Sequence, residues 1–178
     1  MRAQVLLEQY LHVGHRNAGE RQERDDAVRQ RPIHHYLTYN RSDDANRVQD
    51  IVTGLSWLRD QRRVSAVSLA GLDRAGAWAL LARTQAPFVA RTAVDLNRFA
   101  NRDQAFAADL LIPAIRSSGD ITTAAALVAP GALFLHNPGS ALDAEAVTTT
   151  YRAAGNARAV RMEPGKADAA AVARYLRG

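Results

Sequence analysis

The sequence predicts one α/β domain with three layers, in which a mostly parallel sheet of about five strands carries helices on both faces. Short apolar runs alternate along the chain with helical patterns, and strands that alternate with helices are joined by right-handed crossovers into parallel sheets. The 178 residues suffice for one domain, and no linker rich in Pro, Gly or Ser divides them. We therefore expect residues 1–178 to form a single domain.

The expected strands are short apolar runs, each closed by a turn or loop residue. The first run ends at Gly14 and is followed by a polar loop over residues 15–39, which is long enough to be functional or mobile. The second run ends at Gly71, and the third begins after Pro87. In chain order the expected strands are Val5–Val13, Val64–Ala70, Phe88–Val94, Gly131–Leu135 and Ala157–Met162.

Helical patterns occupy the segments between these runs. Ser42 or Asp43 can cap a first helix, whose apolar residues recur at spacings of three and four from Val48 to Leu58. The second helix is small and apolar nearly all round, which predicts a helix buried under the sheet. After the first, the expected helices are Ala75–Ala82, Asn101–Leu111, Thr122–Val128, Asp143–Ala154 and Asp168–Leu176.

Composition and charge argue against several classes of protein. There is no cysteine, which excludes disulfides, cysteine zinc sites and thiol nucleophiles. The net charge is +5, but the arginines are scattered, Lys166 is the only lysine, and aromatic residues are not interleaved with them, so we expect no specific nucleic-acid binding. No apolar stretch approaches the ~18 residues of a membrane span, and residues 1–14 show no signal-peptide pattern. We expect a cytoplasmic protein without a membrane partner.

The histidines belong to segments that leave the carboxyl edge of the predicted sheet, where ligands bind in this architecture. Imidazole and carboxylate groups together suit zinc or manganese, and three such ligands with an open position lower the pKa of a bound water. We predict a divalent metal held by His15, His35 and His136, with a loop hydrogen bond or a capping contact as the alternative for each. The remaining histidines are His12 and His34.

The turn after the second strand is the other candidate site. Gly71, Ala75 and Gly76 are small, which lets the turn tighten and the next helix pack closely, as in a nucleophile elbow. Asp73 stands at the apex, where a helix N-terminus would keep its carboxylate ionised. We predict Asp73 as a catalytic residue that acts as nucleophile, base or metal ligand. The alternative is that Asp73 only caps the following helix.

Several stretches of the chain resemble the carboxyl-terminal part of α/β-hydrolases, and among them acetyl-xylan-esterase-like and dienelactone-hydrolase-like members. The resemblance implies a truncated α/β-hydrolase-like fold and hydrolysis of a small-molecule ester. It rests on residues 38–51, the turn of residues 71–76, Val94-Asp95-Leu96-Asn97 and residues 129–136.

The sequence departs from the family pattern of an apex serine or cysteine, an acid after a later strand and a histidine near the carboxyl end. The apex is Asp73, and the terminal loop reads Gly165-Lys166-Ala167-Asp168, so the Ser-His-acid mechanism is not available. The family's first strands have no counterpart either. The first strand here either closes that gap by pairing with Val64–Ala70 or leaves it to another chain. Because an exposed sheet edge invites pairing, we predict a homodimer through that edge.

Three hypotheses for function remain open. The first is a metal-assisted hydrolase of activated carboxylic or phosphoric esters, in which Asp73 is a further ligand or the general base. The second is a metal-free enzyme in which Asp73 attacks the substrate and His34, His35 or His136 is the base. The third is a catalytically inactive hydrolase-like domain that serves binding or assembly.

Overall fold

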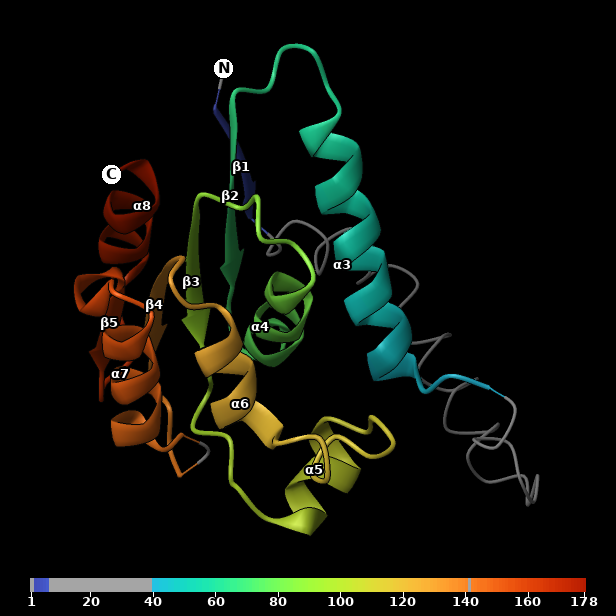
Figure 1. The fold of residues 1–178 in the computed structure, drawn as a ribbon. Helices are drawn as coiled ribbons and strands as arrows, with labels where there is room; N and C mark the ends of the chain where they lie inside the picture. The colour runs from blue at the N-terminus through green and yellow to red at the C-terminus, as the bar shows by residue number, and fades with distance from the viewer. Residues whose placement is uncertain (1, 7–39, 141) are drawn as a thin grey trace.

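The computed structural model describes residues 2–6, 40–140 and 142–178. Their strands form a sheet in the order β1-β2-β3-β4-β5, with every neighbouring pair parallel (Figure 1). The α/β class predicted from the sequence is confirmed. None of the helices in the described ranges is both long enough and apolar enough to cross a membrane. The strands are β1 (Arg2–Leu6), β2 (Ala66–Gly71), β3 (Arg91–Asp95), β4 (Ala132–His136) and β5 (Val160–Glu163).

Three of the described helices begin at side-chain caps that the sequence provides. The Ser42 side chain accepts a hydrogen bond from the Ala45 N–H, and the Asp143 and Asp168 carboxylates cap two later helices in the same way. The helices are α3 (Asp43–Arg59), α4 (Ala75–Thr84), α5 (Asp103–Asp109), α6 (Asp120–Leu127), α7 (Ala144–Ala153) and α8 (Ala169–Arg177), with a 3₁₀ turn, η1 (Ala157–Ala159).

Several predicted boundaries were wrong. The first strand begins at Arg2, where it pairs with Ala66, and the predicted segment from residue 7 onward lies outside the described residues. Strands β2, β3 and β4 each begin later than predicted and end one residue later. The β2–β3 ladder continues to the pair Gly71 with Val94, and the β3–β4 ladder to the pair Asp95 with His136. The fifth strand begins only at Val160, since the ladder with β4 starts there and the residues before it form η1. The predicted helix 101–111 is confined to α5.

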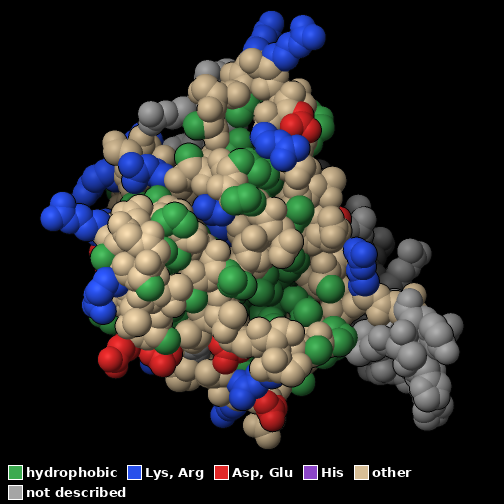
Figure 2. Space-filling model, viewed as in Figure 1, with side chains coloured by type: hydrophobic (Ala, Val, Ile, Leu, Met, Phe, Trp, Pro, Cys, Tyr) green, Lys and Arg blue, Asp and Glu red, His purple; other side chains and the backbone are tan. Residues whose placement is uncertain are grey.

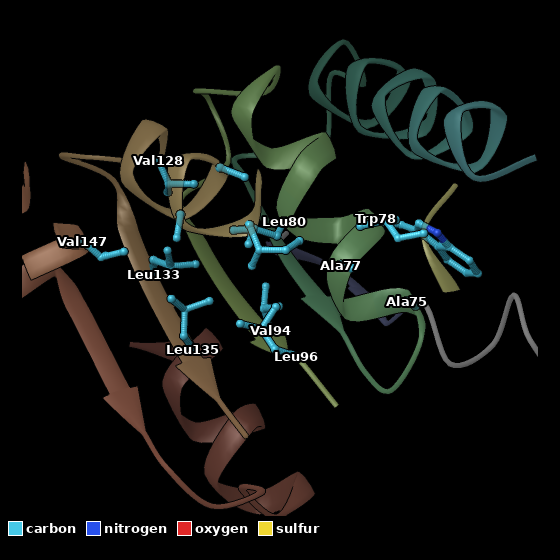
Figure 3. Packing of buried hydrophobic residues seen from close by; sticks show 14 of the residues in the cluster. Ala75, Ala77, Trp78, Leu80, Val94, Leu96, Val128, Leu133, Leu135 and Val147 are labelled. Atoms are coloured by element: carbon cyan, nitrogen blue, oxygen red, sulfur yellow. The ribbon is translucent and has the colours of Figure 1, made fainter. Parts of the chain in front are cut away.

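Alternate residues of the central strands face different helices. Leu69 of β2 packs with α3 and α4, whereas the neighbouring Ala70 packs with α8. In β4, Leu133 and Leu135 join the cluster with α4, α6 and α7, and Phe134 between them packs against α8. Figure 3 shows the cluster that contains Leu133 and Leu135 from nearby, and α8 lies across the sheet from α4 in Figure 1. The period of two in burial reflects a sheet covered on both faces.

Helix α4 approaches the sheet unusually closely, which explains its run of small residues. A Cβ atom at Gly76 would lie 1.7 Å from the Asp95 carbonyl oxygen, and one at Gly71 would lie 2.4 Å from the Ala79 Cβ. The predicted burial of this helix is confirmed, since it contains eight buried residues among its ten. The first turn of α4 is therefore fixed against the end of β3.

Replacing Gly76 with alanine is expected to destabilise the protein by at least about 1–3 kcal/mol, the usual cost of overpacking, because the Asp95 backbone cannot rotate away as a side chain could. Gly54→Ala is the matched control, since Gly54 lies within α3 with no other atom within 4 Å of its Cβ position. That variant should gain about 0.5–1 kcal/mol from helix propensity. Urea unfolding measures both. Equal stability of Gly76→Ala and wild type would contradict the close approach.

Candidate functional site

Four polar residues from four strand ends lie together at the carboxyl edge of the sheet. Asp73 lies in the turn between β2 and α4, Asp95 ends β3, His136 ends β4, and Lys166 follows β5. Backbone hydrogen bonds join the segments after β3, β4 and β5, among them Leu96 N–H to the His136 carbonyl at 3.0 Å and Asn137 N–H to the Glu163 carbonyl at 3.1 Å. The Lys166 side chain joins the turn of Asp73 to them. The edge therefore forms one connected surface.

Asp95 is the buried centre of this group. Its side chain is 0% exposed, and its Oδ1 accepts hydrogen bonds from the Asn97 N–H at 2.7 Å and from the Asn137 amide at 2.9 Å. Burial alone would raise the pKa of Asp95, but these hydrogen bonds, with Lys166 and His136, hold the pKa below its usual value. Asp95 is consequently a carboxylate at neutral pH, although no water reaches it directly.

Lys166 connects the buried carboxylate to the exposed one. Its Nζ donates to Asp73 Oδ1 at 2.6 Å and lies 3.3 Å from Asp95 Oδ2. The hydrogen bond to Asp73, followed by the interaction with Asp95, raises the pKa of Lys166. The ammonium group therefore stays protonated, and it remains half exposed at the surface. Two carboxylates share this one cation.

Asp73 has the conformation expected of an elbow apex. Its φ angle is +51°, and its side chain is 60% exposed. The interpretation of Asp73 as a helix cap is wrong: α4 begins after Arg74 without a side-chain cap, and the Asp73 carboxylate bonds to Lys166 instead. Asp73 is thus an accessible carboxylate on a tight strand-turn-helix junction.

Backbone strain is concentrated at the same edge. Besides Asp73, the non-glycine residues with positive φ include Asn97 and Arg98 after β3 and Asn137 after β4. Gly139 also has positive φ, and a Cβ there would lie 2.6 Å from the Arg98 backbone, so the two loops are in close contact. Such conformations persist only where surrounding contacts fix them, and they cluster at functional sites.

His136 lies beside Asp95 but below the surface. It is 0% exposed, and its Nδ1 accepts a hydrogen bond from the Ala167 N–H at 3.3 Å while lying 4.0 Å from Asp95 Oδ1. Burial lowers the pKa of His136, against the opposing influence of Asp95 and Glu163. The imidazole is therefore neutral at pH 7 with its proton on Nε2, and it holds the loop that carries Lys166.

The predicted metal ligands do not come together within the described residues. His15 and His35 lie outside those residues, as do His12 and His34. Among the residues that the structure describes, no group of three histidine, aspartate or glutamate side chains is arranged to hold a metal ion. The metal site of His15, His35 and His136 stays a prediction.

Two residues of this edge received no role from the sequence. Only the fold shows that Asp95, at the end of β3, lies against Lys166, after β5, and that Lys166 bonds to Asp73. The composition contained a signal, because Lys166 is the only lysine in a chain whose other basic residues are arginine. Figure 2 shows the basic side chains of one face scattered around its outline.

Comparison of the chain with protein-family models, with curated proteins and with solved structures finds no match. The chemistry of the carboxyl edge must therefore be argued from its own residues. It offers an exposed carboxylate at a strained apex, a protonated amine in contact with it, and a buried carboxylate that anchors the amine. These groups can attack an electrophilic centre and neutralise negative charge that develops beside it.

Replacing Asp95 with asparagine is expected to lower the free energy of unfolding at pH 7 by about 1.5–3 kcal/mol, the range for hydrogen bonds to a charged group. Because the native pKa of Asp95 is lowered, its stabilising effect is complete above the unfolded-state pKa of about 3.9 and is lost as the pH falls through the native pKa. The difference between wild type and variant should therefore shrink below about pH 4. Urea unfolding at a series of pH values measures it.

The exposed Asp50 of α3 provides the control, since Asp50→Asn should leave stability nearly unchanged at every pH. A wild-type advantage over Asp95→Asn that persists undiminished to about pH 2, well below the ordinary aspartate pKa, would show that ionisation of Asp95 contributes nothing.

Proposed function

We propose that this chain is a hydrolase of ester bonds in which Asp73 is the reacting group, on a three-layer α/β/α framework of the truncated α/β-hydrolase type. The observation that carries the proposal is the exposed carboxylate at φ +51° on a strand-turn-helix junction. Gly71 and Gly76 make that junction tight, as a nucleophile elbow requires. A strained apex at the edge where α/β sheets bind ligands favours a chemical role over a structural one.

A second candidate is a catalytically inactive hydrolase-like domain that binds or assembles. It is favoured by the direct ion pair between Lys166 and Asp73, which occupies the apex carboxylate. It is favoured too by the burial of His136, the histidine within the described residues, which leaves that imidazole no direct route to a substrate. The two candidates differ in whether Asp73 reacts.

A divalent metal, zinc or manganese, remains part of the first candidate. Imidazole and carboxylate groups would suit either ion. The fit is poor within the described residues, because His136 is buried with Nδ1 already accepting a hydrogen bond, and His15 and His35 lie outside them. We therefore assign no step of the reaction to a metal.

Asp73→Asn is expected to lower kcat/KM for activated esters by at least about 100-fold, because asparagine keeps the shape and tolerates positive φ but is not a nucleophile. Initial rates with p-nitrophenyl esters of carboxylic and phosphoric acids measure the effect. Asp50→Asn, at an exposed position of α3, is the control and should retain the wild-type rate.

Each outcome of this experiment decides between the candidates. Hydrolysis by wild type that Asp73→Asn retains in full would contradict a reacting Asp73, and no hydrolysis of any ester would favour the inactive domain. Metal analysis of the purified protein, with rates before and after a chelator, tests the metal. Loss of both metal and activity would support a metal-assisted reaction, whereas full activity in metal-free protein would contradict it. Substitution of His15, His35 and His136 in turn would then test them as ligands.

The predicted homodimer also remains a proposal. The first strand closes the gap itself, since β1 pairs in parallel with β2 from Arg2 with Ala66 to Leu6 with Ala70. Strand β1 is then an edge of the described sheet, and an unpaired edge can add a strand from a second copy. Light scattering at micromolar concentration should give the mass of two chains, and a monomeric mass would contradict the proposal.

A further inference from the structure

The groups at the apex discriminate between the two kinds of ester that the proposed function leaves open. When a carboxylate adds to a carboxylic ester, the tetrahedral intermediate expels the carboxylate again, because it is a far better leaving group than an alkoxide. Productive attack needs a base that assists a stronger nucleophile, as histidine assists serine. In the described part of the chain the candidate base, His136, is buried and its Nδ1 is engaged by Ala167.

Phosphoryl transfer makes different demands. Its transition state is loose, with little bonding to the nucleophile and with negative charge spread over the phosphoryl oxygens. Catalysis then depends on positioning the nucleophile and on neutralising charge, rather than on raising nucleophilicity. A carboxylate held in one orientation beside a protonated amine satisfies both demands. Asp73 and Lys166 have this arrangement, with 2.6 Å between Oδ1 and Nζ.

Lys166 also has a donor to spare. An ammonium group carries three N–H donors; one donates to Asp73 Oδ1, and Asp95 Oδ2 lies 3.3 Å from Nζ in an ion pair. The side chain is 55% exposed, so a donor remains accessible to an incoming anion. Asp95 is buried and fixed by Asn97 and Asn137, so it anchors Lys166 while that donor binds.

We propose that the substrate of this site is a phosphoric monoester, with Asp73 as the nucleophile and Lys166 as the group that holds a phosphoryl oxygen. This inference rests on the proposed ester hydrolysis at Asp73. An Asp73 carboxylate oxygen bonds to phosphorus, and the ester P–O bond breaks with its electron pair leaving on the alcohol oxygen. Water then bonds to phosphorus, and the Asp73–phosphorus bond breaks with its pair returning to the carboxylate. One proton of the water stays on the released phosphate, and the other reaches the alcohol through solvent.

The test compares p-nitrophenyl phosphate with p-nitrophenyl acetate, which share a leaving group and differ in the centre attacked. Wild type should hydrolyse the phosphate with the higher kcat/KM. Lys166→Met should lower kcat/KM for the phosphate by about 100-fold or more, the typical effect of losing one charge-stabilising donor, and should change that for the acetate far less. Arg152→Met, which removes an exposed cation from α7, is the control and should change neither.

A second measurement does not depend on any variant at Lys166. Wild type incubated with p-nitrophenyl phosphate and quenched in acid should gain the mass of one phosphoryl group on the peptide that contains Asp73. Asp73→Asn should gain none. Thermal unfolding of each variant shows whether a loss of rate reflects loss of the fold.

The outcomes separate this inference from the proposed function. Asp73-dependent hydrolysis of the acetate but not of the phosphate would overturn the phosphoric substrate and leave ester hydrolysis standing. If Lys166→Met lowers kcat/KM equally for both substrates, the role of Lys166 in holding a phosphoryl oxygen would be overturned. Failure to hydrolyse either ester, with no phosphoryl adduct, would overturn both proposals.

Discussion

A buried carboxylate at the end of β3 is the constraint on which the carboxyl edge depends. Removing a charge from water costs several kcal/mol unless it is paired and hydrogen-bonded. Asp95 obtains its partners from three loops: the Asn97 N–H after its own strand, the Asn137 amide after β4, and the Lys166 ammonium after β5. No single loop supplies all the partners of the Asp95 carboxylate. Movement of any one loop would therefore leave a buried charge with fewer partners, which favours the observed position of all three.

The backbone of the same residue fixes the fourth element. The Asp95 carbonyl oxygen occupies the space that a side chain at residue 76 would need, so α4 begins directly against the end of β3. The chain must therefore reverse direction within the few residues between the end of β2 and the start of α4. Asp73 lies in this short turn and adopts a positive φ. Asp95 therefore fixes both residues, Asp73 through the position of α4 and Lys166 through the ion pair. This is why Asp73 and Lys166 meet although 93 residues separate them in the chain.

The sequence predicted what depends on local pattern and missed what depends on contact between distant segments. The apolar spacing from Val48 to Leu58 and the small residues of α4 were sufficient to place two helices, because burial imposes those patterns directly. The end of β3 was misplaced by one residue, because a charged Asp95 gives no sign that it continues the ladder. The role of Lys166 could not be predicted, since it arises from the convergence of three strand ends.

The energetics of the exposed pair give it little part in stabilising the fold. Ion pairs at a surface contribute only about 0.2–1 kcal/mol, so the bond between Asp73 and Lys166 adds little to the stability of the fold. The pair therefore fits the proposed reaction at Asp73 better than a stabilising role. The choice of cation points the same way. In a chain that otherwise uses arginine, the planar guanidinium would align with one carboxylate, whereas a compact ammonium lies between Asp73 and Asp95 and keeps one donor accessible. Both residues thus fit the proposed binding of an incoming anion better than a role in stabilising the fold.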